Sequence, residues 1–352
     1  MFAELPGSAK AFYNSIMVES LNALKLNTFF DNFDAARFNL DGVDRSKLFN
    51  SSDHAFYFEW FFRNMENLFA AYSLLADENS KRLYLHLIAF RLAGHFSVRL
   101  PVGFADKAEE LAEFTAAAHS SPSELPTSGM FGGLKHFDFE YKNEHYVVDC
   151  TSLEYYLVRR QYFYEQGGVK IAPSSGDVVI DGGACVGDTA AVFSSAVGPE
   201  GRVFCFDPVA DHITILGYNV KQFPVANVQI MPYGLSDKNI AADPIVLNRY
   251  APGFSSGNQA VPLRSIDNMV HTKELPKMNF IKLDVEGAEL ESLRGARESI
   301  RRFKPKLAVS LYHKPNDLFE IVAFVKENFP FYSMYIDHYT IHGEETVLYC
   351  KP

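Results

Sequence analysis

From residue 177 to its last residue the chain alternates short apolar segments with segments of helical pattern, and this alternation limits the possible folds more than any other feature. It predicts a parallel sheet flanked by helices. We expect about five parallel strands followed by two more, near residues 177–181, 202–206, 227–232, 278–284, 306–312, 331–338 and 345–350. A short turn separates the last two strands, and because a parallel crossover needs about a dozen residues, they should form an antiparallel hairpin. The expected fold class is α/β, with a parallel sheet closed by an antiparallel C-terminal hairpin.

The residues before 177 follow other patterns. Apolar side chains recur at three- and four-residue steps between residues 56 and 75, which predicts a packed helix face made of Phe58, Phe61, Met65, Leu68, Tyr72 and Leu75. A second helix should follow, with Ser80 as its N-cap and Gly94 as its stop. Residues 119–133 are rich in Ser, Pro and Gly and are interpreted as a linker or exposed loop, and residues 135–150 alternate around a Lys-Asn-Glu turn as a β-hairpin does. We therefore predict a helical domain at 1–118, a linker and hairpin at 119–154, and a third domain at 155–352.

Composition argues against several kinds of partner. The chain has 33 basic and 43 acidic residues, a formal charge of −10, whereas nucleic-acid binders usually carry a basic face. Its four cysteines include no CxxC pair, and no cluster of His, Asp and Glu demands a metal, so we expect no metal site. No apolar run approaches the roughly 20 residues that span a bilayer, and the first ten residues do not resemble a signal peptide. We expect a cytoplasmic protein without a membrane span or a nucleic-acid partner.

The segment "DVVIDGGACVGD", residues 177–188, ends the first predicted strand in an acid and a glycine-rich loop. The spacing of its glycines does not fit the dinucleotide pattern G-x-G-x-x-G. Gly183 and Gly187 still permit a close backbone approach to a ligand. The carboxylate of Asp181 would repel a pyrophosphate and would suit a ligand with an ammonium group, such as S-adenosylmethionine. The alternative is a turn capped by Asp181 in an unrelated α/β protein.

Two further strand ends extend this interpretation. "RVFCFDP" ends in Asp207 and Pro208, and an acid at the carboxyl end of the second strand can accept hydrogen bonds from both ribose hydroxyls of an adenosine. The alternative is an Asp that caps a helix before Pro208. The third strand leads to "YGLSD", where the backbone of Leu235 and Ser236 or the Asp237 side chain is the candidate contact for the adenine edge.

Four segments, "VVIDGGACVGDT", "RVFCFDP", "LRSIDNM" and "NFIKLDVEGAELESLRGA", together resemble the motifs of the FkbM-type S-adenosylmethionine-dependent methyltransferases, from about residue 155 to the end. The resemblance implies a Rossmann-like class I methyltransferase sheet, preceded here by the helical domain, and methylation of hydroxyl groups on sugars and other natural products. One departure is visible, because the second-strand acid is often Glu in that family and is Asp207 here. The expected cofactor-binding residues are Asp181, Gly183, Ala184, Gly187, Asp207, Pro208, Leu235, Ser236, Tyr162 and Tyr164.

The expected catalytic residues lie at the carboxyl ends of the fourth and fifth strands, where open α/β sheets bind ligands. Lys282 and Asp284 are two residues apart and should face the same side, as part of the catalytic site or as a structural ion pair. Glu286 and Glu289 should open the following helix. His313 is the candidate general base, which typically contributes about two to four powers of ten to a rate, and a packed histidine is the alternative.

The sequence therefore predicts an enzyme that methylates a hydroxyl group of a saccharide or other small molecule. Tyr162 and Tyr164 would cover the methionine end of the cofactor, unless they are aromatic core. Two other functions stay open. One is a nicotinamide-dependent oxidoreductase on a similar sheet, and the other is a catalytically inactive binding protein that keeps the fold.

Overall fold

The computed structural model of the chain describes residues 1–35, 38, 40, 42–44, 51–102, 107–126, 133–243 and 261–352. The chain forms two compact units. Unit 1 contains Met1–Gly103 and Leu311–Leu348, and unit 2 contains Phe104–Ser310 and Tyr349–Pro352. The N-terminal helices therefore share a unit with a late segment of the chain.

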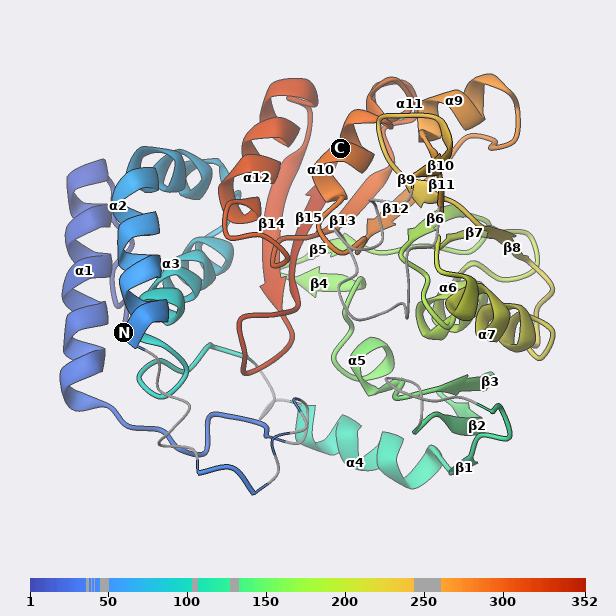
Figure 1. The fold of residues 1–352 in the computed structure, drawn as a ribbon, viewed down its shortest axis with the longest axis horizontal. Helices are drawn as coiled ribbons and strands as arrows, with labels where there is room; N and C mark the ends of the chain where they lie inside the picture. Colours follow the sequence, from blue (N-terminus) through green and yellow to red (C-terminus); the bar gives the residue numbers. More distant parts are fainter. Residues whose placement is uncertain are drawn as a thin grey trace. The chain divides into compact units, whose positions relative to one another are not determined.

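The largest sheet has seven strands in the order β14-β15-β13-β12-β6-β7-β8 (Figure 1). Its strands are β6 (Val178–Gly182), β7 (Arg202–Phe206), β8 (Val228–Met231), β12 (Phe280–Leu283), β13 (Lys306–Ser310), β14 (Ser333–His338) and β15 (Thr346–Lys351). The pairs β6–β7, β7–β8, β6–β12 and β12–β13 are parallel. Each of the seven strands lies where the apolar pattern predicts it, and the α/β fold class is confirmed.

The connections create a reversal in the middle of unit 2. The chain runs from β6 through α6 (Asp188–Val197) to β7 and through α7 (Ala210–Val220) to β8, and later returns to β12 on the other side of β6. Right-handed crossovers that move in opposite directions cover opposite faces of a sheet. Helices α10 (Glu289–Arg294) and α11 (Arg297–Phe303) lead from β12 to β13. The reversal between β6 and β12 is a topological switch point, the place where such sheets bind ligands.

Two smaller elements of unit 2 have no clear counterpart in the sequence pattern. Strands β9 (Gly234–Leu235), β10 (Ile240–Asp243) and β11 (Val261–Arg264) form a three-stranded sheet in the order β10-β11-β9, after helix α7 and before α9 (Ile266–His271). Strands β4 (Tyr164–Gln166) and β5 (Val169–Ile171) pair across two glycines with positive φ. Strands of two to four residues carry too few side chains to show a period of two.

The hairpin predicted over residues 135–150 is confirmed. Strands β2 (Lys135–Tyr141) and β3 (Glu144–Cys150) pair antiparallel, and Lys142 and Asn143 both have positive φ in the two-residue turn. Positive φ at both central positions is typical of a hairpin turn that matches strand twist. Strand β1 (Ser120–Pro122) adds to β2 within the stretch interpreted as a loop, of which residues 127–132 lie outside the described part. Helices α4 (Ala108–Ala117) and α5 (Glu154–Leu157) flank this sheet in sequence.

Unit 1 contains α1 (Ala9–Leu26), α2 (Ser51–Leu74), α3 (Glu78–Ala93) and α12 (Asp317–Asn328), and α2 packs against α1, α3 and α12. The predicted face of α2 is its packed face, since Phe61, Leu68 and Tyr72 are buried. Gly94 ends α3 as expected, but the expectation of Ser80 as N-cap is wrong. Asp77 caps the helix by accepting the backbone N–H of Ser80 at 2.7 Å. No helix in the described part of the chain has the length and apolar character that a membrane span needs.

Candidate functional site

The carboxyl ends of β6, β7 and β12 meet at the switch point of unit 2. Asp181 is the second-last residue of β6, Asp207 follows β7 directly, and Asp284 follows β12 directly. The loop from Gly183 to Gly187 joins β6 to α6 in the middle of this edge. The sequence-predicted residues of the first, second and fourth strands are therefore neighbours in one sheet.

The loop uses its own backbone groups within the protein. The N–H groups of Gly183 and Ala184 donate to the carbonyl of Phe206 at 2.8 and 3.0 Å. The N–H of Cys185 donates to Asp207 at 3.0 Å. A phosphate-binding loop presents such N–H groups to its ligand, so this loop is not built as a phosphate cradle. The rejection of the dinucleotide pattern agrees with this geometry.

Close packing explains the glycine at position 183. Its φ is +78°, and a Cβ atom there would lie 1.8 Å from the carbonyl oxygen of Asp284. Any side chain would push the β6–α6 loop away from the end of β12. Glycine therefore lets two strand ends meet at the switch point.

Asp181 and Lys282 face one another across β6 and β12. They are register partners, the ammonium lies 3.1 Å from the carboxylate, and both side chains are fully buried. The hydroxyl of Thr189 donates to the same carboxylate at 2.7 Å. Lys282 also donates to the carbonyl of Gly183 at 2.7 Å. This buried pair fixes the start of the glycine loop to the neighbouring strand.

The expectation that Asp284 would be the ion-pair partner of Lys282 is wrong. Asp284 lies beyond the end of β12, whereas the parallel register sets Asp181 directly opposite the lysine. Burial lowers the pKa of Lys282, but the carboxylates of Asp181 and Asp284 outweigh it and raise the pKa overall. Lys282 therefore stays protonated at neutral pH. This geometry favours the structural ion pair over a proton acceptor.

Asp207 is held from several sides. Its carboxylate accepts the N–H groups of Cys185 at 3.0 Å and Val209 at 2.9 Å, and His212 Nδ1 lies at 3.1 Å. Val209, and not Asp207, is the N-cap residue of α7, so Asp207 is not the capping residue of the alternative although it accepts the N–H of Val209. A carboxylate has about four acceptor positions. Three are used here, and the fourth is the one that a ligand hydroxyl would take.

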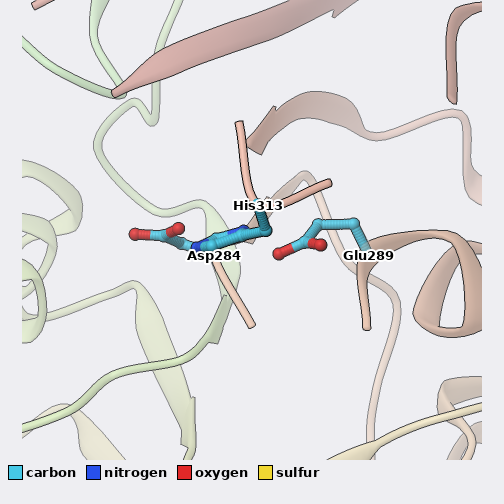
Figure 2. A group of neighbouring side chains, drawn as sticks. All are labelled: Asp284, Glu289 and His313. Atoms are coloured by element: carbon cyan, nitrogen blue, oxygen red, sulfur yellow. The ribbon is translucent and has the colours of Figure 1, made fainter. Parts of the chain in front are cut away.

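The residues around Asp284 form an acidic group beside the loop. The hydroxyl of Tyr162 donates to Asp284 at 2.8 Å, and the carboxylate oxygens of Asp284 and Glu289 lie within 4.8 Å of one another. Figure 2 shows that Asp284 comes from the segment after β12 and Glu289 from the start of α10. Glu289 accepts the N–H of Val285 at 2.8 Å. Glu286 was expected to open this helix, but it lies before it with a φ of +54°.

The remaining predicted cofactor contacts have mainly structural partners. The N–H of Ser236 donates to the carbonyl of Arg264 at 3.1 Å, and Leu235 belongs to β9. Tyr164 is buried in β4 with its ring 5.0 Å from that of Tyr349. Tyr162 is also buried, and its ring lies 5.3 Å from the ammonium of Lys282.

Sequence reasoning missed Asp188, the first residue of α6. Burial raises the pKa of its carboxyl to about 6, although the N–H of Thr189 and the ammonium of Lys282 act in the opposite direction. The hydroxyl of Tyr156 donates to it at 3.4 Å. An acid directly after the second loop glycine was the available signal. A carboxyl with a strongly shifted pKa at a ligand-binding edge is typical of a functional site.

His313 belongs to unit 1, and its ring packs against that of Tyr312 with centroids 4.2 Å apart. It lines a cavity of about 390 Å³ within that unit. Figure 2 labels it on the segment that follows β13. His313 was expected at the end of a strand near residues 306–312, and it lies three residues after β13, which ends at Ser310.

Comparison with known proteins shows similarity to a family model, to a curated relative and to a solved fold. Residues 181–332 match the model of the methyltransferase FkbM domain. The chain is 33% identical over 129 residues to the hexuronic acid methyltransferase AglP of Haloferax volcanii, an alignment that covers 36% of this chain and 52% of the relative. The crystal structure of methyltransferase FkbM from Methylobacillus flagellatus KT is similar with a TM-score of 0.55 and 19% identity, over 83% of this chain and 60% of that one. The chain thus spans about half the length of the curated relative that it matches.

Proposed function

We propose that this protein, in which residues 181–332 match the model of the FkbM methyltransferase domain, transfers a methyl group from S-adenosylmethionine to a hydroxyl group of a saccharide. The observation that carries the proposal is the match of that domain. The relative at 33% identity is named for hexuronic acid, and this name suggests a sugar as the acceptor. A soluble sugar or a sugar on a larger molecule would serve equally.

The charges at the switch point support a cationic cofactor. Asp181 and Lys282 neutralise one another as a buried pair. The carboxylates of Asp188, Asp207 and Asp284 lie at the same edge of the sheet. Acids in a partly buried site favour the ammonium and sulfonium charges of S-adenosylmethionine and disfavour the pyrophosphate of a nicotinamide cofactor.

The residues that would hold the cofactor follow from the same geometry. Asp207 keeps one acceptor position for a ribose hydroxyl. Gly183 and Gly187 have φ values of +78° and +99°, which suit glycine and fix the path of the loop beside the expected cofactor. We expect the cofactor to lie among the residues that the sequence predicted, Ala184, Pro208, Leu235, Ser236, Tyr162 and Tyr164.

The proposed reaction needs one proton acceptor and a fixed alignment. S-adenosylmethionine supplies a methyl group on a sulfonium, and the acceptor oxygen forms a bond to that carbon as the carbon–sulfur bond breaks. His313 would take the hydroxyl proton, and Asp284 is the second candidate. Covalent geometry keeps the Cα of His313 within about 11 Å of Ser310, the last residue of β13. Holding the two reactants in line would supply most of the acceleration.

Calorimetry with the full chain tests the cofactor. S-adenosylmethionine should bind and NAD should bind weakly or not at all. Asp207→Asn should weaken S-adenosylmethionine by about 1–3 kcal/mol, the usual effect of leaving a hydrogen-bond partner unpaired. Tighter binding of NAD would support the oxidoreductase alternative instead, and cofactor binding without turnover on any saccharide would support the inactive binding protein.

A further inference from the structure

Unit 1 contains a cavity of about 390 Å³, and most of its lining residues lie outside the range 181–332 that matches the methyltransferase domain. Its wall is rich in rings, from Phe33, Phe38, Tyr57, Phe90, Phe96 and Tyr312. Several of them contact one another, since Phe33 and Phe38 stack with centroids 5.5 Å apart and an interplanar angle of 17°. Aromatic faces joined by a few polar groups are typical of a small-molecule site. The face of a sugar ring that presents C–H groups is apolar and can pack against such aromatic rings.

Arg91 supplies a cation at this cavity. Its guanidinium donates to the carbonyl of Pro315 at 2.8 Å and lies 5.3 Å from the ring of Trp60. In the part of the chain that the structure describes, no carboxylate lies within ion-pair distance of it. A guanidinium has five N–H donors in a fixed plane that matches a carboxylate. Arg91 can therefore bind a carboxylate without losing its contact with Pro315.

His95 provides a second polar group that the fold does not use. Its Nε2 is buried and has no hydrogen-bond partner among the described residues. Burial, followed by His342 and His54, lowers the pKa of His95 to about 4, so the ring is neutral at pH 7. A neutral imidazole nitrogen can exchange a hydrogen bond with a sugar hydroxyl. A buried polar atom without a partner destabilises the fold, and a ligand hydroxyl would remove that cost.

Carboxylates and a base complete the lining. Asp53 and Glu344 also border the cavity, and carboxylates accept hydrogen bonds from sugar hydroxyls. His313, the proposed general base, belongs to the same wall. All of these residues lie in unit 1. One ring-sized cavity thus offers aromatic faces, acceptors for hydroxyls, a cation and a proton acceptor.

We propose that this cavity binds the sugar ring of an acidic saccharide, with Arg91 on the sugar carboxylate and His95 on a hydroxyl. The inference rests on the proposed function, because the ligand is of the acceptor class of that reaction.

Binding of two matched ligands to the full chain tests this inference without turnover. The probes are methyl glucuronide and methyl glucoside, which differ in a carboxylate at one carbon. The wild-type protein should bind the glucuronide more tightly. Arg91→Gln should raise the dissociation constant of the glucuronide by about ten- to hundredfold and change that of the glucoside by much less. Arg99→Gln is the control, because Arg99 is exposed and paired with Asp31 in the same unit.

A second variant separates binding from folding. His95→Phe removes the unpartnered nitrogen and keeps the ring, so the thermal midpoint should stay the same or rise, while both saccharides bind more weakly. Equal binding of both saccharides, or glucuronide binding that survives Arg91→Gln, would overturn the inference. If either of these outcomes is found but S-adenosylmethionine binds and a saccharide is methylated, the proposed function stands and only this sugar site is rejected. If Arg91 controls glucuronide binding but S-adenosylmethionine does not bind, the proposed function fails and the sugar site remains.

Discussion

Among single residues, Asp188 links folding to the cofactor site most directly. Its pKa is about 6 in the folded chain and near 3.8 when unfolded, so ionisation between these values opposes folding. The penalty is absent below pH 4 and complete above pH 6. Asp188→Asn keeps an acceptor for the N–H of Thr189. We expect it to raise the free energy of unfolding by about 1–3 kcal/mol at pH 7.5 and to weaken S-adenosylmethionine binding.

Urea unfolding at pH 7.5 and pH 4 measures this effect. The gain in stability should shrink at the lower pH, where the wild-type carboxyl is mostly protonated. Asp211→Asn is the control, because Asp211 lies in the first turn of α7 with an exposed side chain. An equal gain in both variants, or a loss of stability in Asp188→Asn, would contradict the burial argument.

Replacing His313 tests whether this histidine accepts the proton of the hydroxyl that is methylated. His313→Ala should lower turnover by about two to four powers of ten and leave the affinity for S-adenosylmethionine unchanged. The wild-type rate should fall at acid pH, because an imidazolium cannot accept a proton, and the variant should lose that dependence. His271→Ala, at the exposed end of α9, is the matched control. Full activity in His313→Ala would return the role to Asp284.

Among elements, the loop between β6 and α6 is restricted by the end of β12. Gly183→Ala adds a Cβ at 1.8 Å from the Asp284 carbonyl oxygen, whereas Gly176 has a similar φ of +81° with nothing within 4 Å. Gly176→Ala should lose about 1–2 kcal/mol for the backbone conformation alone. Gly183→Ala should lose more than about 4 kcal/mol or fail to fold. Equal losses of unfolding free energy in the two variants would contradict this prediction, because they would show that the end of β12 moves to accommodate the added Cβ.

The cross-strand pair of β6 and β12 makes a second prediction at this scale. Lys282→Met leaves the Asp181 carboxylate buried without its cation, and removing one partner of such a pair costs about 3–5 kcal/mol. Adding Asp181→Asn to that variant removes the uncompensated charge and should recover much of the loss. Urea unfolding of the two variants gives the comparison. A loss below about 1 kcal/mol in Lys282→Met would mean that water reaches the pair.

At the scale of the whole molecule, the sequence predicted the seven-stranded sheet and the resemblance of residues 181–332 to the FkbM domain, because both depend on local patterns. Each strand has at least three apolar residues among its four to six, and the motifs keep their order along the chain. The contacts between elements were harder to predict from the sequence. The partner of Lys282 depends on strand register, which the separate strands do not reveal.

The same reason explains the other differences. Asp77 caps α3 by accepting the N–H of Ser80. The hydroxyl of Ser80 instead accepts the N–H of Ile336 at 3.0 Å, a contact with a distant part of the chain. The shifted pKa of Asp188 follows from burial by residues far apart in sequence. The cavity of unit 1 combines residues 33–96 with residues 312–344, so no local motif announces it. Long-range packing, which sequence patterns do not encode directly, accounts for each case.

Transfer of a labelled methyl group tests the central claim most directly. The full chain is incubated with S-adenosylmethionine labelled in its methyl group and with methyl glucuronide, and the product is analysed by mass spectrometry and NMR. The account predicts a labelled methyl ether at a hydroxyl oxygen of the sugar and an equal amount of S-adenosylhomocysteine. The account would be contradicted if the protein binds S-adenosylmethionine but transfers no label to methyl glucuronide or to any other sugar in a panel of neutral and acidic saccharides.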